Sequence, residues 1–558
     1  MASHDFEPEK EKPSDEVSQD SRPLSIEKTD EHARGASPVS PLQEPTSSYP
    51  QGTRLAIIVV SLMLSNFLIA LDNTIIATAI PKITDEFHGL DKVAWYGSAY
   101  FMTFGAFQST WGKFFKYFPL KTYFIAAMVI FEVGSLICAV AQNPTTLIVG
   151  RAIGGFGGAG IATGAFTIIG FAAEPKKRPQ LIGFTGGTYG IAAVLGPLLG
   201  GVFSDKVSWR WCFYINLPIG GVAAILVLFF FHTPDDAKPA EASWREKLLQ
   251  MDLVGAALVM GLIVTFILAL QYGGLTKPWK GSVVIGLFVG SFALFVTCVF
   301  WEIYQGERAM LMPRLFKQRF VWVSCVFQFF FAGSYFTILY YLPIYFQSVH
   351  NASAIGSGVR NLPLIIALTI SVIFSGAVLV KVGYATPFMI IGAAIGAISS
   401  GLLYMLDIDS SAGRWIGFQI LCGFAAGGTF QVPLSVVQVN AKPEDMSATT
   451  AMVFFFQMIG GSFSLSAAQS AFNNRMVSRL ASTAPGVNPA TVLVTGATQI
   501  RWAFPPAQVP GVVVAYMAGL KVVFAITIGT FGMACLISMF GSWERLHAED
   551  LKETGGVA

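Results

Sequence analysis

Residues 181–203 read LIGFTGGTYGIAAVLGPLLGGVF, and this stretch decides the class of fold. It holds no charged side chain from end to end. At about 1.5 Å per residue, a helix of this length crosses the roughly 30 Å of hydrocarbon in a bilayer. The stretch is therefore predicted to be a transmembrane helix.

Apolar runs of similar length recur through the chain, fourteen in all. They are residues 55–79, 95–115, 123–141, 147–172, 181–203, 211–231, 253–271, 283–301, 321–346, 359–380, 387–406, 415–439, 447–472 and 520–540. The composition agrees, since 53% of residues are hydrophobic, 12% are charged and the mean hydropathy is +0.59. These values predict an all-α polytopic membrane protein with fourteen transmembrane helices.

The ends of the chain differ in character from its middle. Residues 1–50 are rich in Ser, Pro, Glu, Asp and Lys and contain no apolar run, which predicts a disordered tail. Lys and Arg are concentrated in the loops on the same side as this tail, which indicates that both termini are cytoplasmic. A second cytoplasmic tail is predicted at 546–558.

An internal repeat divides the membrane part. The glycine-rich stripe that follows Arg151, at 154–160, has a counterpart at 423–428, after Arg414 and eight helices later. This offset predicts a six-helix bundle at 51–233, two inserted helices and linkers at 234–319, and a second six-helix bundle at 320–545. Secondary transporters are commonly built from such repeats, with the substrate site at the interface near the bilayer midplane.

Four segments resemble signature motifs of the major facilitator superfamily. They are residues 71–81 (LDNTIIATAIP), Arg151 with its glycines, residues 196–201 (GPLLGG) and residues 209–221 (WRWCFYINLPIGG). With fourteen spans, the chain resembles the fungal branch of the drug:proton antiporter family over about residues 52–545. The resemblance implies the major facilitator fold and proton-driven export of toxins or drugs. One departure is Lys116, which stands where the superfamily places an acid between helices two and three.

Charged residues inside the predicted spans are few, and the ones that stand out are Asp72, Glu132 and Arg151. Charges are costly in a bilayer and usually lie in a pair or on a transport pathway. Asp72 and Arg151 fall at similar depths, which is compatible with pairing, and Glu132 is the alternative partner. We therefore expect these three residues to couple transport to protons. The structural alternatives are a cap on a helix break for Asp72, a hydrogen-bonded buried acid for Glu132 and a packing anchor for Arg151.

The motif at 196–201 has a direct physical interpretation. The Gly196-Pro197 pair removes a backbone hydrogen bond and bends its helix, while Gly200 and Gly201 allow a neighbouring helix to approach closely. This motif is the one associated with antiporters, so we expect it to control how the two halves pack and rock.

A site for varied lipophilic molecules needs apolar and aromatic side chains with a few amides. The expected substrate-facing residues are Tyr189, Gln328, Tyr335, Gln431, Phe455 and Gln457. Asn351 begins an Asn-Ala-Ser sequon in an outside loop and is a candidate for glycosylation. A long outside loop is predicted at about 473–519.

Several classes of function are excluded. The six cysteines lie inside apolar runs, the six histidines show no metal-ligand spacing, and no phosphate-binding loop or nucleophile elbow occurs. A net charge of +3 is too small to indicate a nucleic-acid partner. We expect no enzyme activity, no metal and no cofactor, with the proton gradient as the driving force. The expected partners are the lipid bilayer, protons and a small lipophilic substrate, and the chain is expected to be a monomer.

The sequence thus predicts a proton-coupled exporter of small lipophilic compounds, such as fungal secondary metabolites, toxins or antifungal drugs. The expected location is the plasma membrane, with a vacuolar or vesicle membrane as the alternative. An importer on the same scaffold, of the siderophore type, and a transporter-like sensor that moves nothing remain as alternative functions.

Overall fold

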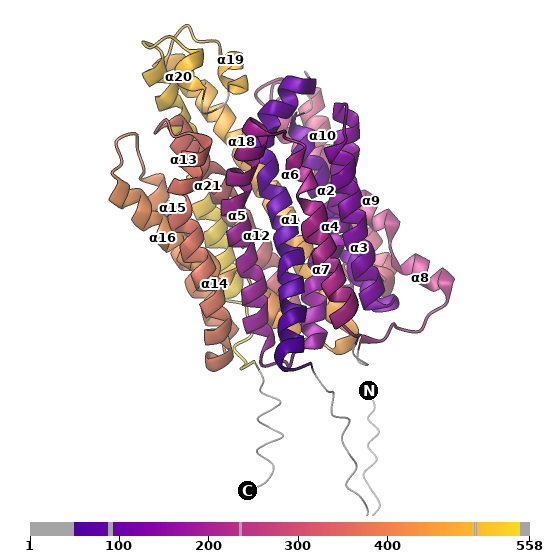
Figure 1. The fold of residues 1–558 in the computed structure, drawn as a ribbon. Coiled ribbons are helices and arrows are strands. Elements are labelled where there is room, and N and C mark those ends of the chain that lie inside the picture. The colour runs from indigo at the N-terminus through magenta and orange to yellow at the C-terminus, as the bar shows by residue number, and fades with distance from the viewer. Residues whose placement is uncertain (1–49, 88–92, 234–236, 496, 498, 547–558) are drawn as a thin grey trace, which may run out of the picture. The chain divides into compact units, whose positions relative to one another are not determined.

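A computed structural model describes residues 50–87, 93–233, 237–495, 497 and 499–546. The predicted tails at 1–50 and 546–558 therefore lie outside the described residues, except for Pro50 and Leu546. The described elements belong to a compact unit that begins at residue 49, and they are helical (Figure 1).

The helices follow the order of the predicted spans. The first group comprises α1 (Gly52–Phe87), α2 (Val93–Tyr117), α3 (Leu120–Ala139), α4 (Pro144–Ala172), α5 (Arg178–Lys206), α6 (Trp211–Tyr214) and α7 (Asn216–Phe230). The middle group comprises α8 (Trp244–Gln250), α9 (Leu253–Tyr272), α10 (Ser282–Gln305), the 3-10 helix η3 (Gly306–Arg308) and α11 (Pro313–Phe316). The last group comprises α12 (Arg319–Ser348), α13 (Ala354–Arg360), α14 (Leu362–Val382), α15 (Ala385–Tyr404), α16 (Ala412–Thr429), α17 (Val432–Asn440), η4 (Pro443–Asp445), α18 (Met446–Thr483), α19 (Pro489–Val494), α20 (Ile500–Ala503) and α21 (Val509–Ser538).

Within the described residues, twelve helices or helix pairs are long and apolar enough to cross a membrane. The predicted count of fourteen is not confirmed. The two runs without a counterpart among the twelve are 95–115 and 181–203, which fall in α2 and α5. Both runs are helical, within helices of 25 and 29 residues.

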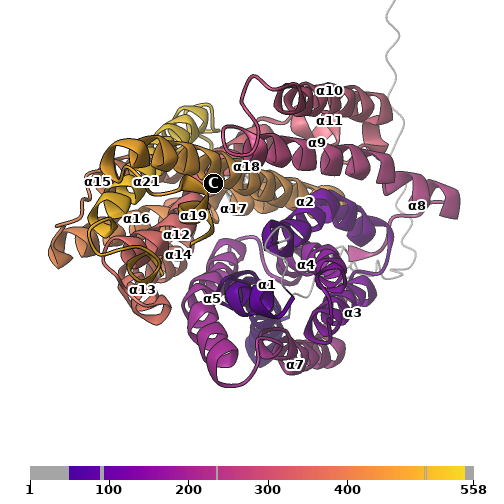
Figure 2. The ribbon, with the colours of Figure 1, turned by 90° about the horizontal axis from the view of Figure 1, so that it is seen from above.

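The two large groups meet through their helices. Figure 2 shows α1–α5 and α7 gathered on one side and α12–α16 with α21 on the other. We call α1–α7 the first half and α12–α21, with η4, the second half. They pack together through α2 against α18 and through α5 against α14. The middle helices lie beside this interface, because α9 packs on α2 and α18, and α10 packs on α9 (Figure 2).

We name the two ends of the bundle by their contents. The basic end holds the turns between α2 and α3 and between α4 and α5, while the cap end holds α19 and α20 (Figure 1). The outer side of α10 is apolar and exposed, as a lipid-facing surface requires, with Val289, Phe292 and Phe300 each more than 60% exposed.

Close helix contacts explain the glycine stripe of α4. A methyl group added to Gly134 of α3 would collide with the backbone of Gly154, and one added to Gly157 would collide with the backbone of Phe131. A methyl group on Gly160 would meet Ala127 and Trp111 at 2.6 Å. The stripe therefore lets α3 and α4 touch nearly backbone to backbone, which is the packing role of small residues in membrane helices.

The long loop predicted at 473–519 is mostly helical. α18 continues to Thr483 and α21 begins at Val509, so the connection is shortened to residues 484–508 with α19 and α20 inside it. Residues 473–483 are polar but contain no Gly or Pro, so the helix extends beyond its apolar part. Arg501 attaches the connection to the end of α12 by donating to the carbonyls of Ser348 and Val349.

Asn351 lies in the turn between α12 and α13 at the cap end. It is exposed and has a left-handed φ of 53°, which Asn tolerates better than most residues. The sequon is therefore accessible, and glycosylation at Asn351 stays a prediction.

Candidate functional site

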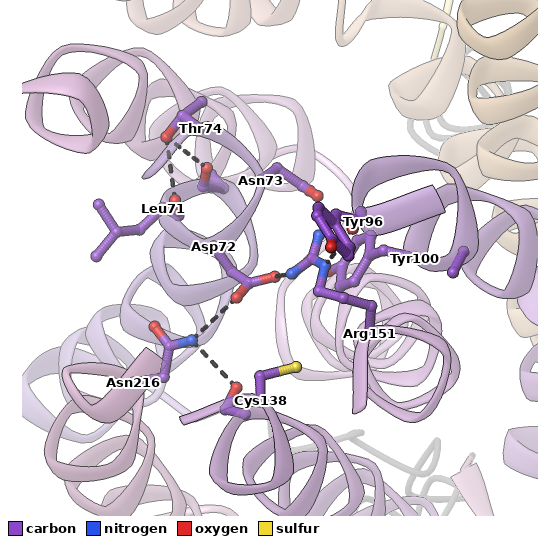
Figure 3. Close-up of polar contacts among 12 residues, drawn as sticks. Leu71, Asp72, Asn73, Thr74, Tyr96, Tyr100, Cys138, Arg151 and Asn216 are labelled. Carbon is purple, nitrogen blue, oxygen red and sulfur yellow. Dashed lines mark hydrogen bonds and ion pairs between the residues drawn. The ribbon is translucent and has the colours of Figure 1, made fainter. Parts of the chain in front are cut away.

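A buried ion pair joins α1 to α4. The Nη1 of Arg151 donates to the Oδ2 of Asp72 at 2.5 Å, and both residues are only 2% exposed (Figure 3). The start of α4 sets the depth of Arg151, because Asn143 caps the helix by accepting from the amide of Thr146 at 2.8 Å. The sequence placed Asp72 and Arg151 at depths compatible with pairing, and the structure shows this pair.

Arg151 has two further contacts, both with α2. Its Nε donates to the carbonyl of Tyr96 at 2.9 Å, and its guanidinium lies 4.3 Å from the ring centre of Tyr100. Its remaining nitrogen, Nη2, is buried without a hydrogen-bond partner among the described residues. These two contacts would therefore hold Arg151 on α2 even without its contact with Asp72.

Asn216 of α7 holds the other oxygen of Asp72, and sequence analysis did not select it. Its amide donates to the Oδ1 of Asp72 and to the Oγ of Ser135 in α3, both at 3.1 Å (Figure 3). Asn216 is fully buried. The sequence signal that could have identified Asn216 is its amide beside Leu217-Pro218 in the motif at 209–221. An amide buried within the membrane requires a hydrogen-bond partner.

The hydrogen bonds around Asp72 therefore join four helices. α1 carries the carboxylate, α4 and α7 contribute Arg151 and Asn216, and Asn216 connects it to Ser135 of α3. α1 is continuous from Gly52 to Phe87, so Asp72 does not cap a helix break. The arginine and the amide replace part of the hydration that this buried carboxylate has lost.

Glu132 does not replace Asp72 as the partner of Arg151. Both of its carboxylate oxygens are buried without a hydrogen-bond partner among the described residues, so it is not a hydrogen-bonded buried acid either. Glu132 faces Gly220 of α7, where a methyl group would collide with its carboxyl group. It lies on the side of α3 that packs against α7.

The antiporter motif lies directly beside Asp72. A methyl group on Gly196 of α5 would collide with the hydroxyl of Thr74 in α1, and that hydroxyl donates to the carbonyl of Ala192 at 3.1 Å. Gly200 is buried and Gly201 is half-buried in the same helix, while the side-chain placement of Pro197 lies outside the described part. The motif thus packs α5 onto the segment of α1 that carries Asp72.

Two small cavities lie between the halves, next to this segment. The first, of about 50 Å³, is lined by Asn73, Thr74, Phe101, Tyr189, Phe336, Leu339, Tyr340, Met458, Gly461, Ser462 and Leu465. The second, of about 20 Å³, is lined by Asn66, Ile69, Phe104, Ala162, Phe166, Tyr189, Phe430, Gln431, Phe454, Gln457 and Met458. Tyr189 lines both. A drug-sized ligand needs about 300 Å³ or more, so the halves must separate to admit one here.

The structure gathers five of the six expected substrate-facing residues in or next to these cavities. Tyr189, Gln431 and Gln457 line them, and Gln328 donates to the Oε1 of Gln457 at 2.9 Å. Tyr335 is 5% exposed and packs edge to face on Phe430, another lining residue.

Phe455 does not line either cavity. It is buried with Ala106, Val259 and Ile459 at the contact with α9. Its neighbour Phe454 lines the second cavity instead, because adjacent residues of a helix are rotated by about 100° and face different surfaces.

The basic end is closed by polar contacts across the halves. Lys116 at the end of α2 contacts Asp445 of η4 at 3.3 Å, and Arg314 of α11 binds both oxygens of Asp445 at 2.9 Å. Arg178 also donates to the carbonyl of Gln438 at 2.8 Å. Lys116, the departure from the superfamily pattern, therefore still forms an ion pair, with the acid placed in the second half.

The helices satisfy their own backbone hydrogen bonds, as spans in lipid must, and form two halves with small cavities between them. A buried ion pair lies beside these cavities in the first half, and this arrangement defines a membrane transporter. The model of the Major Facilitator Superfamily matches residues 62–465, and the chain belongs to this superfamily. Membership confirms the expectation of a transporter rather than an enzyme.

Relatives agree over almost the whole length. The chain is 62% identical over 512 residues to a probable efflux pump, gsfJ, of Penicillium aethiopicum, covering 91% of this chain and 92% of that protein. It is 40% identical over 507 residues to the MFS-type efflux pump MFS1 of Trichophyton rubrum, covering 91% and 95%. These similarities confirm the predicted resemblance to fungal efflux pumps.

Similarity to a solved structure supports the fold alone, because the sequence identity is low. The human organic anion transporter MFSD10 (TETRAN) matches with a TM-score of 0.58 and 13% identity, covering 88% of this chain and 100% of that chain.

Proposed function

We propose that the chain is a proton-coupled efflux transporter that exports small lipophilic compounds, such as fungal secondary metabolites, toxins or antifungal drugs. The observation that supports the coupling is the buried carboxylate of Asp72, which is held by Arg151 and Asn216. Asp72 is adjacent in the chain to Asn73, which lines the first cavity. The efflux pumps among its relatives support the direction of transport.

The coupling follows from the charge of the pair. When Asp72 takes a proton, its attraction to Arg151 falls, while the carbonyl of Tyr96 and the ring of Tyr100 still hold the guanidinium. α1 and α4 then lose a contact that favours the conformation seen here. Release of the proton to the other side of the membrane restores the contact, so one proton can accompany each change of access.

The proposal includes the arrangement in the membrane. α2 and α5, of 25 and 29 residues, are long enough to span and pack between candidate spans, which supports fourteen crossings. The loop charges support a cytoplasmic basic end and cytoplasmic termini. The proposed location is the plasma membrane of a fungus, with a vacuolar or vesicle membrane as the alternative, and the proposed state is a monomer.

The topology has its own test. Tags at Ser3 and Val557 should be protected from external protease in intact cells, while a Ser353→Cys variant should react with an impermeant maleimide. Tags on opposite sides of the membrane would contradict the fourteen-span arrangement.

An importer on the same scaffold and a non-transporting sensor are the alternatives. The motif at 196–201, associated with antiporters, favours export over import. Cells that carry the gene should accumulate less of a lipophilic dye than cells without it, whereas an importer would raise accumulation and a sensor would leave it unchanged.

The proton role is tested with Asp72→Asn, which keeps the shape and one hydrogen-bond acceptor but cannot exchange a proton at neutral pH. In inverted vesicles, we expect it to abolish dye uptake driven by a pH gradient while dye binding is retained. Asp409→Asn, an exposed acid at the cap end, is the matched control. Gradient-driven uptake in Asp72→Asn at the wild-type rate would remove Asp72 from the mechanism and make Glu132 the next candidate.

A further inference from the structure

α8–α11, with η3, lie between the two halves in the sequence, and we call them the inserted segment. At the cap end this segment is bound to the second half. Asn474 of α18 donates to the carbonyl of Gly273 at 3.2 Å, and a side chain on Gly274 would collide with Asn474. Further along α9, the rings of Phe266 and Phe463 lie edge to face with their centres 4.4 Å apart. The turn after α9 and the body of α9 therefore both pack closely on α18.

The inserted segment is also bound to the second half at the basic end. Two buried acids, Asp252 at the start of α9 and Glu302 in α10, accept from the amide of Met310 at 3.0 Å and from the next amide at 2.7 Å. These bonds fix the end of the segment, where Arg314 of α11 binds both oxygens of Asp445 at 2.9 Å. Contacts at both ends of the bundle thus connect the inserted segment to the second half.

The first half reaches the inserted segment through Lys113 of α2. The ammonium group donates to the Oε1 of Gln250 in α8 at 3.2 Å and to the carbonyl of Glu307 in η3 at 3.1 Å. Lys113 is only 1% exposed. Thr110, one turn earlier, donates to the carbonyl of Met251 at 3.4 Å. The end of α2 is therefore fastened to the inserted segment by hydrogen bonds from two of its side chains.

The hydrogen-bond partners of Lys113 suit a contact that forms and breaks. Both described acceptors are neutral, one an amide oxygen and the other a backbone carbonyl. Release of an ammonium group from a buried carboxylate would leave that carboxylate uncompensated, whereas release from neutral acceptors leaves no new buried charge. Asp252 and Glu302 attract the ammonium group through space, but the amides that they accept from stay with them when it leaves. Lys113 can therefore move into water at a lower cost than the partner of a buried ion pair.

We propose that Lys113 is a positioning residue that closes the basic end by docking α2 on the inserted segment, and that this segment moves with the second half. When the basic end opens, Lys113 leaves Gln250 and Glu307, while the contacts of the segment with α18 and η4 stay. The contact is additional to the ion pair between Lys116 and Asp445. This inference goes beyond the proposed export function, because it applies to either direction of transport.

The first test measures opening of the basic end in purified full-length protein with the six native cysteines replaced. Ala448 of α18 packs where Gly112 of α2 approaches, so the labelling rate of Ala448→Cys by a maleimide reports separation of the two helices. Lys113→Met keeps most of the length and removes the donors, and we expect about a tenfold higher rate, as for loss of a hydrogen bond from a charged group. Gln250→Met should raise the rate by a smaller factor, because the carbonyl of Glu307 still accepts.

Two comparisons decide whether the contact acts as proposed. Lys381→Met removes an exposed lysine at the end of α14 and should leave the rate near the wild-type value. The Lys113→Met/Gln250→Met double variant should label no faster than Lys113→Met, because both changes break the same contact. A Lys113→Met rate within twofold of the Lys381→Met rate would overturn the proposal, even if the variant unfolds at a lower temperature. A double variant with the product of the two single effects would overturn it as well.

The second test measures which half the inserted segment follows. Val289→Cys in α10, Val222→Cys in α7 and Ile398→Cys in α15 place spin labels at exposed positions. In Lys113→Met, pulsed electron paramagnetic resonance should show a new distance population between α10 and α7 and an unchanged distribution between α10 and α15. A new population between α10 and α15, or none between α10 and α7, would contradict the proposal. Neither test depends on transport, so failure here is distinguishable from failure of the proposed function, which the dye assay reports.

Discussion

Asp445→Asn tests the contact that closes the basic end. The change removes one charge and keeps the size of the side chain, so it weakens the contacts with Lys116 and Arg314 without opening a hole. Lys116 comes from the first half, whereas Arg314 comes from the segment before the second half. We expect the variant to open at the basic end more often than wild type.

The magnitude follows from burial. An exposed ion pair contributes about 0.2–1 kcal/mol, and removal of one partner from a buried pair costs about 3–5 kcal/mol. The side chain of Asp445 is 3% exposed, while those of Lys116 and Arg314 are 16% and 44% exposed. The cost therefore lies between these limits, at about 2 kcal/mol, which corresponds to about a 30-fold change in the open population.

The assay uses a cysteine that is covered when the basic end is closed. Ala448 of α18 is 4% exposed and packs where Gly112 of α2 approaches. In purified protein with the six native cysteines replaced, the labelling rate of Ala448→Cys by an impermeant maleimide should rise about 30-fold in Asp445→Asn. Lys116→Gln should raise it by a smaller factor, because Arg314 still binds Asp445.

Glu444→Gln is the matched control. It removes a neighbouring exposed acid, whereas the described ion pairs of Lys116 and Arg314 are with Asp445 and Glu307, so the labelling rate should stay near the wild-type value. A rate in Asp445→Asn within twofold of the Glu444→Gln rate would refute the reasoning. The closed end would then be held by apolar packing of α2 on α18 instead of by charge.

Two further predictions concern the junction around Asp72. Asn216→Leu should lower gradient-driven export at least about tenfold while the protein still reaches the membrane, because Asp72 loses a hydrogen-bond donor in an environment without water. Equal export by Asn216→Leu and wild type in vesicles would show that the amide is only a packing residue. Gly196→Ala should reduce thermal stability and export through its collision with Thr74, a cost of about 1–3 kcal/mol, and the added change Thr74→Ala should restore both; a double variant no better than Gly196→Ala would place the damage elsewhere.

Much of this arrangement could be predicted because membrane burial makes a few residues conspicuous. Asp72 and Arg151 stand out as charges at matching depths in apolar runs, and the structure pairs them. Asn216 carries no charge, so a search for charges in apolar runs passes over it, and only the amide within the motif at 209–221 marks it. Phe455 was expected at the substrate surface, but the rotation of α18 about its axis, which decides between Phe454 and Phe455, depends on packing with α9.

The partner of Lys116 could not be predicted for a different reason. Asp445 is 329 positions further along the chain, and only the packing of α2 on α18 brings the two together. The sequence therefore showed the departure from the superfamily pattern without showing how the second half compensates for it.

The glycine contact between α3 and α4 has a consequence for how the transporter moves. Two helices that touch nearly backbone to backbone cannot slide or rotate past each other without collision, so α4 carries Arg151 as part of a stiff pair. α1 and α5, joined through Thr74 and Gly196, form a second pair that carries Asp72. Protonation of Asp72 would then allow the two rigid helix pairs of the first half to move relative to each other. This movement would reach the second half through the contact of α5 with α14.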